Sequence, residues 1–115
     1  MILLLLKLLI GHALADFSLQ TDPMANGKNW KNKPKYIPEG QKYVPCWPYW
    51  MTAHAFVHGG AVLFITGSAI CCVLEIISHW VIDTFKCANI TNPNQDQFLH
   101  FLMKIVYCLI LFYCI

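Results

Sequence analysis

The chain of 115 residues contains no arginine, so all eight of its basic residues are lysines. Charged residues make up only 12% of the sequence and hydrophobic residues 57%, well to the apolar side of a soluble domain. The net charge of +2 is small and no basic stripe alternates with aromatic residues, so nucleic acid is not an expected partner. No C-x-x-C or G-x-S-x-G motif occurs, which argues against a zinc ribbon, a dithiol redox site and a serine nucleophile. The composition indicates a protein that has the lipid bilayer as its solvent.

Four apolar segments are the candidate helices, at about 1–16, 48–66, 68–87 and 95–115. The region from 48 to 86 is too long for one membrane crossing of about 20 residues, and Thr66-Gly67-Ser68 is the best place for a turn. Prolines fall only between these segments or at a helix start, where proline is tolerated. The predicted fold class is all-α. We expect residues 1–115 to form one polytopic membrane domain, an up-down four-helix bundle.

The first segment also has one feature of a signal peptide. Ala13-Leu14-Ala15 has the small-x-small form of a cleavage site. However, no positive charge precedes the apolar stretch, and Lys7 lies in its middle. We therefore interpret residues 1–16 as a membrane helix.

A polar, aromatic loop of about 30 residues, 17–47, joins the first two helices. Five of the eight lysines lie in it: Lys28, Lys31, Lys33, Lys35 and Lys42. Lys86 stands just before the short second loop, 88–94, whereas the two termini and the turn at 66–68 carry no charged side chain. The positive-inside rule then predicts that both loops are cytoplasmic and both termini outside, in a bacterial inner membrane.

Polar residues recur at i, i+4 spacing in each of the four segments, which places them on one helix face. The groups are His12 with Asp16, His54 with His58, Glu75 with His79 and Asp83, and Asp96 with His100. They include all five histidines and four of the six acidic residues. When the helices are threaded up and down, all four groups come to the end of the bundle that carries the lysine-rich loops.

These residues predict a metal site. A charged side chain in a membrane helix costs at least ~2.5–3.5 kcal/mol, so such residues usually face the interior and have a function. Imidazole and carboxylate donors from facing helices suit zinc foremost, and also manganese or iron. The candidate ligands are His12, Asp16, His54, His58, His79, Asp83 and His100, with Glu75 and Asp96 as candidate general bases. Nine donors exceed the four of one zinc ion, so either two ions share the site or some residues orient the ligands.

A purely structural interpretation is also open. One H-x-x-x-H pair is more often a hydrogen-bonded buried pair than a metal site, and polar residues can join helices in a bilayer. Glu75 can simply neutralise Lys104, which lies at similar depth, or Lys7. Gly59 and Gly60 are expected to be positions of close helix packing.

The motifs GHALADFSLQTD with the following MANGK, HAFVH, EIISHWVIDTFK and DQFLHFLMK resemble a bacterial and phage family known as domain of unknown function 3307. The resemblance covers most of the chain except the basic loop. A looser similarity connects it to inner-membrane proteins described as metal-dependent hydrolases. The resemblance implies membrane helices with a polar site, implies hydrolysis more weakly, and makes Gln20 and Asp22 further site candidates. From the residues alone, Asp22 is expected to cap a short helix that opens at Pro23.

The first functional hypothesis is a membrane-embedded metal-dependent hydrolase that acts on a lipid ester or lipid phosphate at the cytoplasmic interface. Lys86 or the loop lysines would hold an anionic headgroup. The second hypothesis is a non-catalytic, phage-encoded protein that binds a host membrane partner, or copies of itself, with a structural polar cluster. A third is a di-iron lipid oxidase.

Overall fold

The computed structural model describes residues 1–32, 38–42 and 45–114, and the helical elements are the only regular secondary structure among them. In chain order they are α1 (Ile2–Ala13), the π-helical turn η1 (Leu14–Ser18), α2 (Asp22–Gly27), α3 (Trp47–Thr66), α4 (Ala69–Cys87) and α5 (Pro93–Tyr113). Lys33 and Lys35 of the basic loop, and Ile115 at the end of the last expected helix, lie outside the described residues.

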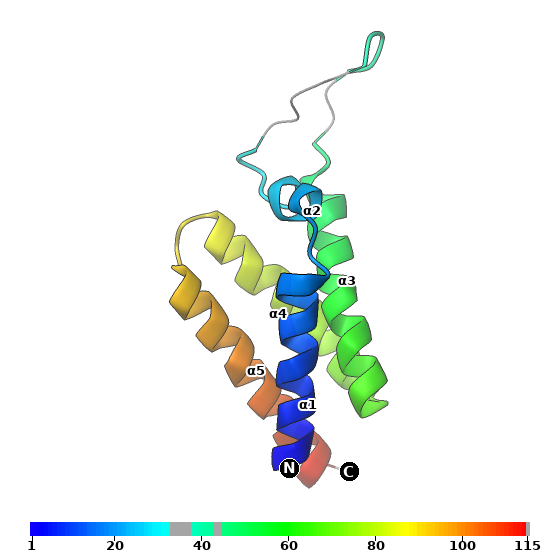
Figure 1. The fold of residues 1–115 in the computed structure, drawn as a ribbon, viewed down its shortest axis with the longest axis vertical. Coiled ribbons are helices and arrows are strands. Elements are labelled where there is room, and N and C mark those ends of the chain that lie inside the picture. Colours follow the sequence, from blue (N-terminus) through cyan, green and yellow to red (C-terminus); the bar gives the residue numbers. More distant parts are fainter. Residues whose placement is uncertain (33–37, 43–44, 115) are drawn as a thin grey trace.

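The four long helices run alternately up and down (Figure 1). Helix α1 contacts α3 and α5, and α4 contacts the same two helices, so the four enclose one interior. Helix α2 packs on α3 at one end of the bundle, and both termini lie at the other end (Figure 1). The chain is therefore all-α, as predicted.

Local signals in the sequence explain where the helices begin and end. Gly67 adopts φ 68°, a left-handed conformation that ends α3, and Ser68 then caps α4 by accepting a hydrogen bond from the Cys71 amide at 3.2 Å. Asn92 and Gln95 form a reciprocal capping box at the start of α5. The tight turn at 66–68 lies where the sequence predicted it.

The first helix differs from the prediction of one continuous helix over 1–16. Its α-helical part ends at Ala13, and a π turn follows, closed by the hydrogen bond from the Leu19 amide to the Leu14 carbonyl at 2.7 Å. Such wide turns are frequent at functional sites, and this one carries the buried Asp16. The expected cap of the next helix is also wrong. Thr21, not Asp22, accepts the hydrogen bond from the Met24 amide.

The adjacent glycines of α3, Gly59 and Gly60, differ in how closely other atoms approach them. A Cβ on Gly59 would collide with Ile76 and would lie 3.2 Å from the Cys72 carbonyl oxygen of α4. A Cβ on Gly60 would meet nothing within 4 Å. Close packing therefore explains Gly59, whereas the expectation for Gly60 is wrong because its side of α3 faces open space.

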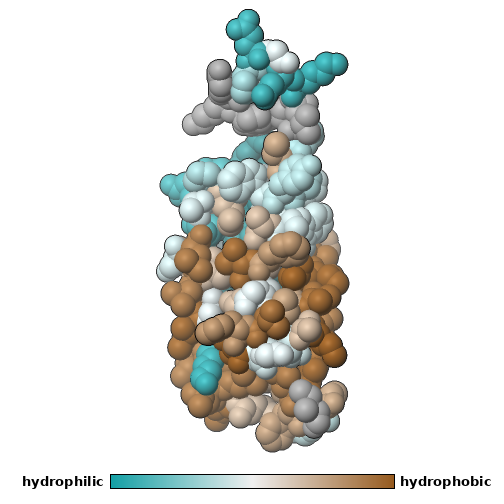
Figure 2. Space-filling view, turned by 90° about the vertical axis from the view of Figure 1, so that its right-hand side faces the viewer, coloured by the Kyte–Doolittle hydropathy of each residue, from teal (hydrophilic) through white to brown (hydrophobic). Residues whose placement is uncertain are grey.

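The outer surface of the bundle is largely apolar. In Figure 2 a broad hydrophobic region covers the bundle, and hydrophilic residues gather at the end that carries the loop. Within the described residues, only α5 is long and apolar enough to cross a membrane. Helix α1 has 12 residues, and α4 carries Glu75, Asp83 and Lys86. Length and hydropathy therefore do not establish the four predicted crossings.

Candidate metal centre

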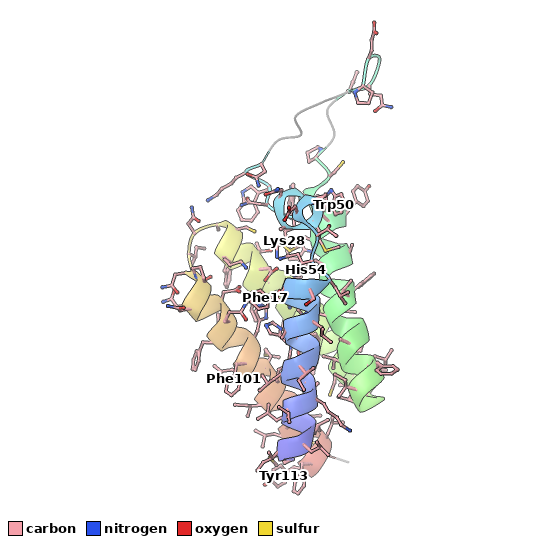
Figure 3. All side chains as sticks on the ribbon, in the orientation of Figure 1. Phe17, Lys28, Trp50, His54, Phe101 and Tyr113 are labelled. Carbon is pink, nitrogen blue, oxygen red and sulfur yellow. The ribbon has the colours of Figure 1, made fainter. Side chains whose placement is uncertain are left out.

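A cluster of charged and imidazole side chains fills the interior of the bundle near α2. All nine predicted donors belong to it, and all are buried: His12, Asp16, His54, His58, Glu75, His79, Asp83, Asp96 and His100. The lysines Lys28 and Lys104 are buried with them. Figure 3 shows Lys28 and His54 close together at this end of the bundle. We call these eleven residues, with Lys86 and Gln97 at the edge, the polar cluster.

The five histidines lie ring against ring. The His58 and His79 rings stack with centroids 3.6 Å apart, and His79 stacks on His100 at 4.3 Å. The His12 ring lies 5.1 Å from that of His58, and His54 lies 4.8 Å from both His58 and His79. Since each imidazole offers a nitrogen lone pair or an N–H group, this packing concentrates metal donors in a small volume.

Asp16 faces two of these histidines. Its Oδ1 lies 3.3 Å from Nε2 of His54 and also 3.3 Å from Nε2 of His58, and its Oδ2 accepts a hydrogen bond from Gln97 at 2.8 Å. Among the described residues, no lysine pairs with this carboxylate. The π turn and the i, i+4 spacing of His54 and His58 bring the three side chains together.

Several imidazole nitrogens in this part of the polar cluster lie 3.3–3.5 Å from a carboxylate oxygen but make no hydrogen bond among the described residues. The Nε2 atoms of His54, His58 and His79 are buried without a hydrogen bond in the described part of the chain. Donor atoms of Asp16, His54, His58 and His79 all lie within 4.8 Å of one another. Three imidazoles and one carboxylate are a ligand set that zinc accepts in tetrahedral geometry. The residues fit a divalent metal ion.

Asp83 is the second centre of the polar cluster. Its Oδ1 lies 3.2 Å from Nε2 of His100, and its Oδ2 lies 3.3 Å from Nε2 of His54. Lys28 donates a hydrogen bond to the same Oδ2 at 2.6 Å. A loop lysine expected to meet a headgroup at the membrane surface thus lies inside the bundle, because α2 folds over its end.

Both carboxylate oxygens of Glu75 accept hydrogen bonds. Lys104 donates to its Oε1 at 2.6 Å and Tyr107 donates to its Oε2 at 2.7 Å, while Nδ1 of His79 lies 3.4 Å from Oε1. The structural alternative for Glu75 and Lys104 is therefore observed as an ion pair. Lys7 is exposed on α1 and does not share it.

Asp96 lies at the edge of the polar cluster, where α5 begins. Its Oδ2 lies 3.4 Å from Nζ of Lys86 and accepts a hydrogen bond from Gln97 at 3.3 Å. Its Oδ1 is buried and has no hydrogen-bond partner among the described residues, and it lies 3.5 Å from Nε2 of His100. Asp96 therefore keeps one acceptor oxygen available.

Charge pairing within the polar cluster is nearly complete. Lys28, Lys86 and Lys104 pair with Asp83, Asp96 and Glu75 respectively. Asp16 is the one carboxylate of the four that has no lysine partner among the described residues, and it lies beside histidines instead. A cation is therefore electrostatically most favoured beside Asp16.

The two candidates added by the family resemblance lie outside the polar cluster. Gln20 donates a hydrogen bond to the Asp16 carbonyl oxygen at 3.1 Å and so supports the π turn. Asp22 is exposed at the start of α2.

Sequence reasoning missed Gln97 and Tyr107. Gln97 joins two of the predicted donors, because its Oε1 lies 3.0 Å from Nε2 of His12 while its amide group donates to Asp16. Tyr107 lies three residues after Lys104 on the same face of α5, so helical spacing from the Asp96, His100 and Lys104 series offered a signal for it. For Gln97, the only signal in the sequence was its position directly after Asp96.

Comparison with known proteins identifies a family without assigning an activity. No curated protein and no solved structure matches the chain. A family model described as "Protein of unknown function (DUF3307)" matches residues 4–115, which includes every residue of the polar cluster. The chain belongs to this family of proteins of unknown function.

Proposed function

We propose that this chain is a membrane-embedded metal-dependent hydrolase that acts on a lipid ester or a lipid phosphate at the cytoplasmic interface. The observation that carries the proposal is the surrounding of Asp16. This buried carboxylate has no lysine partner among the described residues and faces the Nε2 atoms of His54 and His58, which make no hydrogen bond there. An intramembrane cluster of this kind is functional by default, since a bilayer offers no water to satisfy it.

The surface of the bundle supports a membrane location. All four long helices expose large apolar side chains, among them Leu6, Phe64, Ile77, Phe98 and Phe112. The polar cluster lies toward the hydrophilic loop end, which the positive-inside rule places in the cytoplasm. We propose that the headgroups of lipids in the same leaflet reach the site from this end.

The proposed ligands of the ion are Asp16, His54, His58 and His79. Their mixture of nitrogen and oxygen donors suits zinc foremost, with manganese or iron as alternatives. A bound ion of this kind lowers the pKa of a water ligand and polarises a scissile ester or phosphate group. Gln97 holds the ligand carboxylate in place through its hydrogen bond to Oδ2 of Asp16.

The contacts of the two candidate bases distinguish their roles. Both oxygens of Glu75 accept hydrogen bonds from Lys104 and Tyr107, so Glu75 suits a positioning role beside His79. Asp96 keeps an unpartnered oxygen near His100. We therefore assign the general base to Asp96 and a positioning function to Glu75.

The lysine pairs favour a second candidate function. Three of the four carboxylates already have a lysine partner, which is the pattern of a structural polar core. In this case the chain would be a non-catalytic membrane protein that binds a host membrane partner through its apolar surface. This alternative needs no metal.

Metal analysis of the detergent-purified protein separates the two functions. The hydrolase predicts at least one zinc, manganese or iron ion per chain, lost in Asp16→Asn and retained in the matched control Asp22→Asn. It also predicts release of fatty acid or phosphate from a lipid panel, abolished in Asp96→Asn.

Stoichiometric metal without turnover of any lipid would leave a metal-binding protein and remove the hydrolase. Bound iron with a visible absorption band would point instead to lipid oxidation. No metal in either the wild type or Asp22→Asn, after growth with added zinc, would overturn the proposal in favour of the structural core.

A further inference from the structure

Lys28 occupies an unusual place for a loop lysine. It follows α2 directly, its side chain is only 4% exposed, and its Nζ lies 2.6 Å from Oδ2 of Asp83. The two residues are 55 positions apart in the sequence. An ammonium group is costly to bury unless it is paired, so the ion pair with Asp83 is what allows Lys28 to be buried.

The side chains around Asp83 form a second group of metal donors. Donor atoms of His79, Asp83 and His100 lie within 4.8 Å of one another, and all three residues are buried. Nε2 of His79 lies 3.5 Å from Oδ2 of Asp83 and has no hydrogen-bond partner among the described residues. A fully buried imidazole nitrogen that makes no hydrogen bond and lies beside a carboxylate suits a cation ligand, and the cation already at that carboxylate is the Lys28 ammonium.

We propose that His79, Asp83 and His100 form a second divalent-cation position, and that the ion and the Lys28 ammonium exclude each other there. Lys28 already holds Oδ2 of Asp83, and two positive charges on one buried carboxylate repel strongly. The inference rests on the proposed function, which assigns the first ion to the Asp16 side of the polar cluster.

His79 connects the two positions, since it belongs to both groups of donors. An ion beside Asp83 draws His79 toward that position and leaves Asp16, His54 and His58 around the first ion. Three protein ligands with one open position are the pattern of catalytic zinc sites, whereas four closed ligands are that of structural sites. Withdrawal of Lys28 is therefore a route from a one-ion centre in which His79 competes with water for the fourth position to a two-ion centre in which that position stays open.

The segment that carries Lys28 is held by aromatic contacts. A Cβ on Gly27 would lie 2.5 Å from Cδ1 of Trp50 on α3, so the backbone of α2 packs directly against that ring. The Trp30 ring lies 5.8 Å from that of Trp47. These contacts fix the backbone near Lys28, while its long side chain can change rotamer and move its ammonium group away from Asp83.

The test counts ions in the full-length, detergent-purified protein saturated with cobalt or zinc, by native mass spectrometry. We expect one ion per chain in the wild type, two in Lys28→Met, and one in the matched control Lys31→Met, whose lysine is exposed. Equal ion numbers in Lys28→Met and the wild type would overturn the inference. If both variants hold one ion, the proposed function is unaffected. No ion in the wild type and one in Lys28→Met would support the second position and remove the first.

A measurement on the unmodified chain decides the question if Lys28→Met does not fold. Amine acylation followed by mass spectrometry reports how accessible Lys28 is during a zinc titration. Acylation of Lys28 is expected to stay low while one ion is bound and to rise several-fold only if a second ion enters, while that of Lys31 stays constant. Two ions bound per chain with Lys28 still protected would overturn the exclusion.

Discussion

The Tyr107 hydroxyl donates a hydrogen bond to Oε2 of Glu75 at 2.7 Å, deep between α4 and α5. Neither side chain is more than 1% exposed. The same hydroxyl lies 3.2 Å from Oγ of Ser78, and Lys104 holds the other Glu75 oxygen. The polar cluster is thus anchored at its deepest point by a carboxylate whose two oxygens are both occupied.

Replacement of Tyr107 by phenylalanine removes this hydrogen bond while keeping the ring. We expect a loss of about 1.5–3 kcal/mol in the free energy of unfolding, as for other hydrogen bonds to charged groups. Thermal or denaturant unfolding in detergent measures it. Tyr113→Phe is the control, because Tyr113 is exposed. Equal stability of the two variants would contradict the anchoring role.

Gln97 is expected to support metal binding without being a ligand. Its side chain contacts both His12 and Asp16, so Gln97→Ala removes the hydrogen bond that orients the ligand carboxylate through Oδ2. Loss of a residue that orients a ligand typically lowers metal affinity 10–100-fold. A competition titration with a chromogenic chelator measures the change, with the exposed Asn94→Ala as control. Unchanged affinity in Gln97→Ala would show that Asp16 needs no such support.

The two glycines of α3 give a matched pair for helix packing. Gly59→Ala places a methyl group against Ile76 and α4, which is expected to cost about 1–3 kcal/mol of stability. Gly60→Ala meets open space, and alanine is up to about 1 kcal/mol more favourable than glycine inside a helix. Thermal unfolding of the two variants should therefore shift in opposite directions. Equal shifts would mean that the close approach of α3 to α4 is not required.

Membrane topology is testable by cysteine labelling in cells. In a background that carries Cys46→Ser and Cys114→Ser, which removes the two exposed cysteines, a cysteine at Lys42 is expected to react only when the inner membrane is made permeable. A cysteine at Leu3, at the opposite end of the bundle, is expected to react from outside. The positive-inside rule is the physical reason, since the lysine-bearing loops resist export. The reverse pattern would invert the proposed orientation, and free access to both positions would argue against a membrane-spanning bundle.

Much of the helical framework follows from local signals. Glycine at the left-handed end of α3, the Ser68 cap and the Asn92 capping box act over four residues or fewer, so they are visible in the sequence. The π turn at Leu14–Ser18 was not visible, because no residue type demands it. It depends on the side chains that Asp16 meets inside the bundle.

The sequence by itself determined the all-α class, the tight turn at 66–68 and the nine donors at i, i+4 spacing, because helical periodicity places such residues on one face. Only the tertiary structure decided which charges meet. Lys28 reaches Asp83 across 55 positions and Gln97 reaches Asp16 across 81, and contacts over such separations leave no periodic trace. In the folded chain, three of the four carboxylates in the polar cluster pair with a lysine. The fourth, Asp16, faces histidine and glutamine instead. The packing of α4 on α5 supplies two of the lysine pairs and the segment after α2 supplies the third, because burial makes every unpaired charge costly.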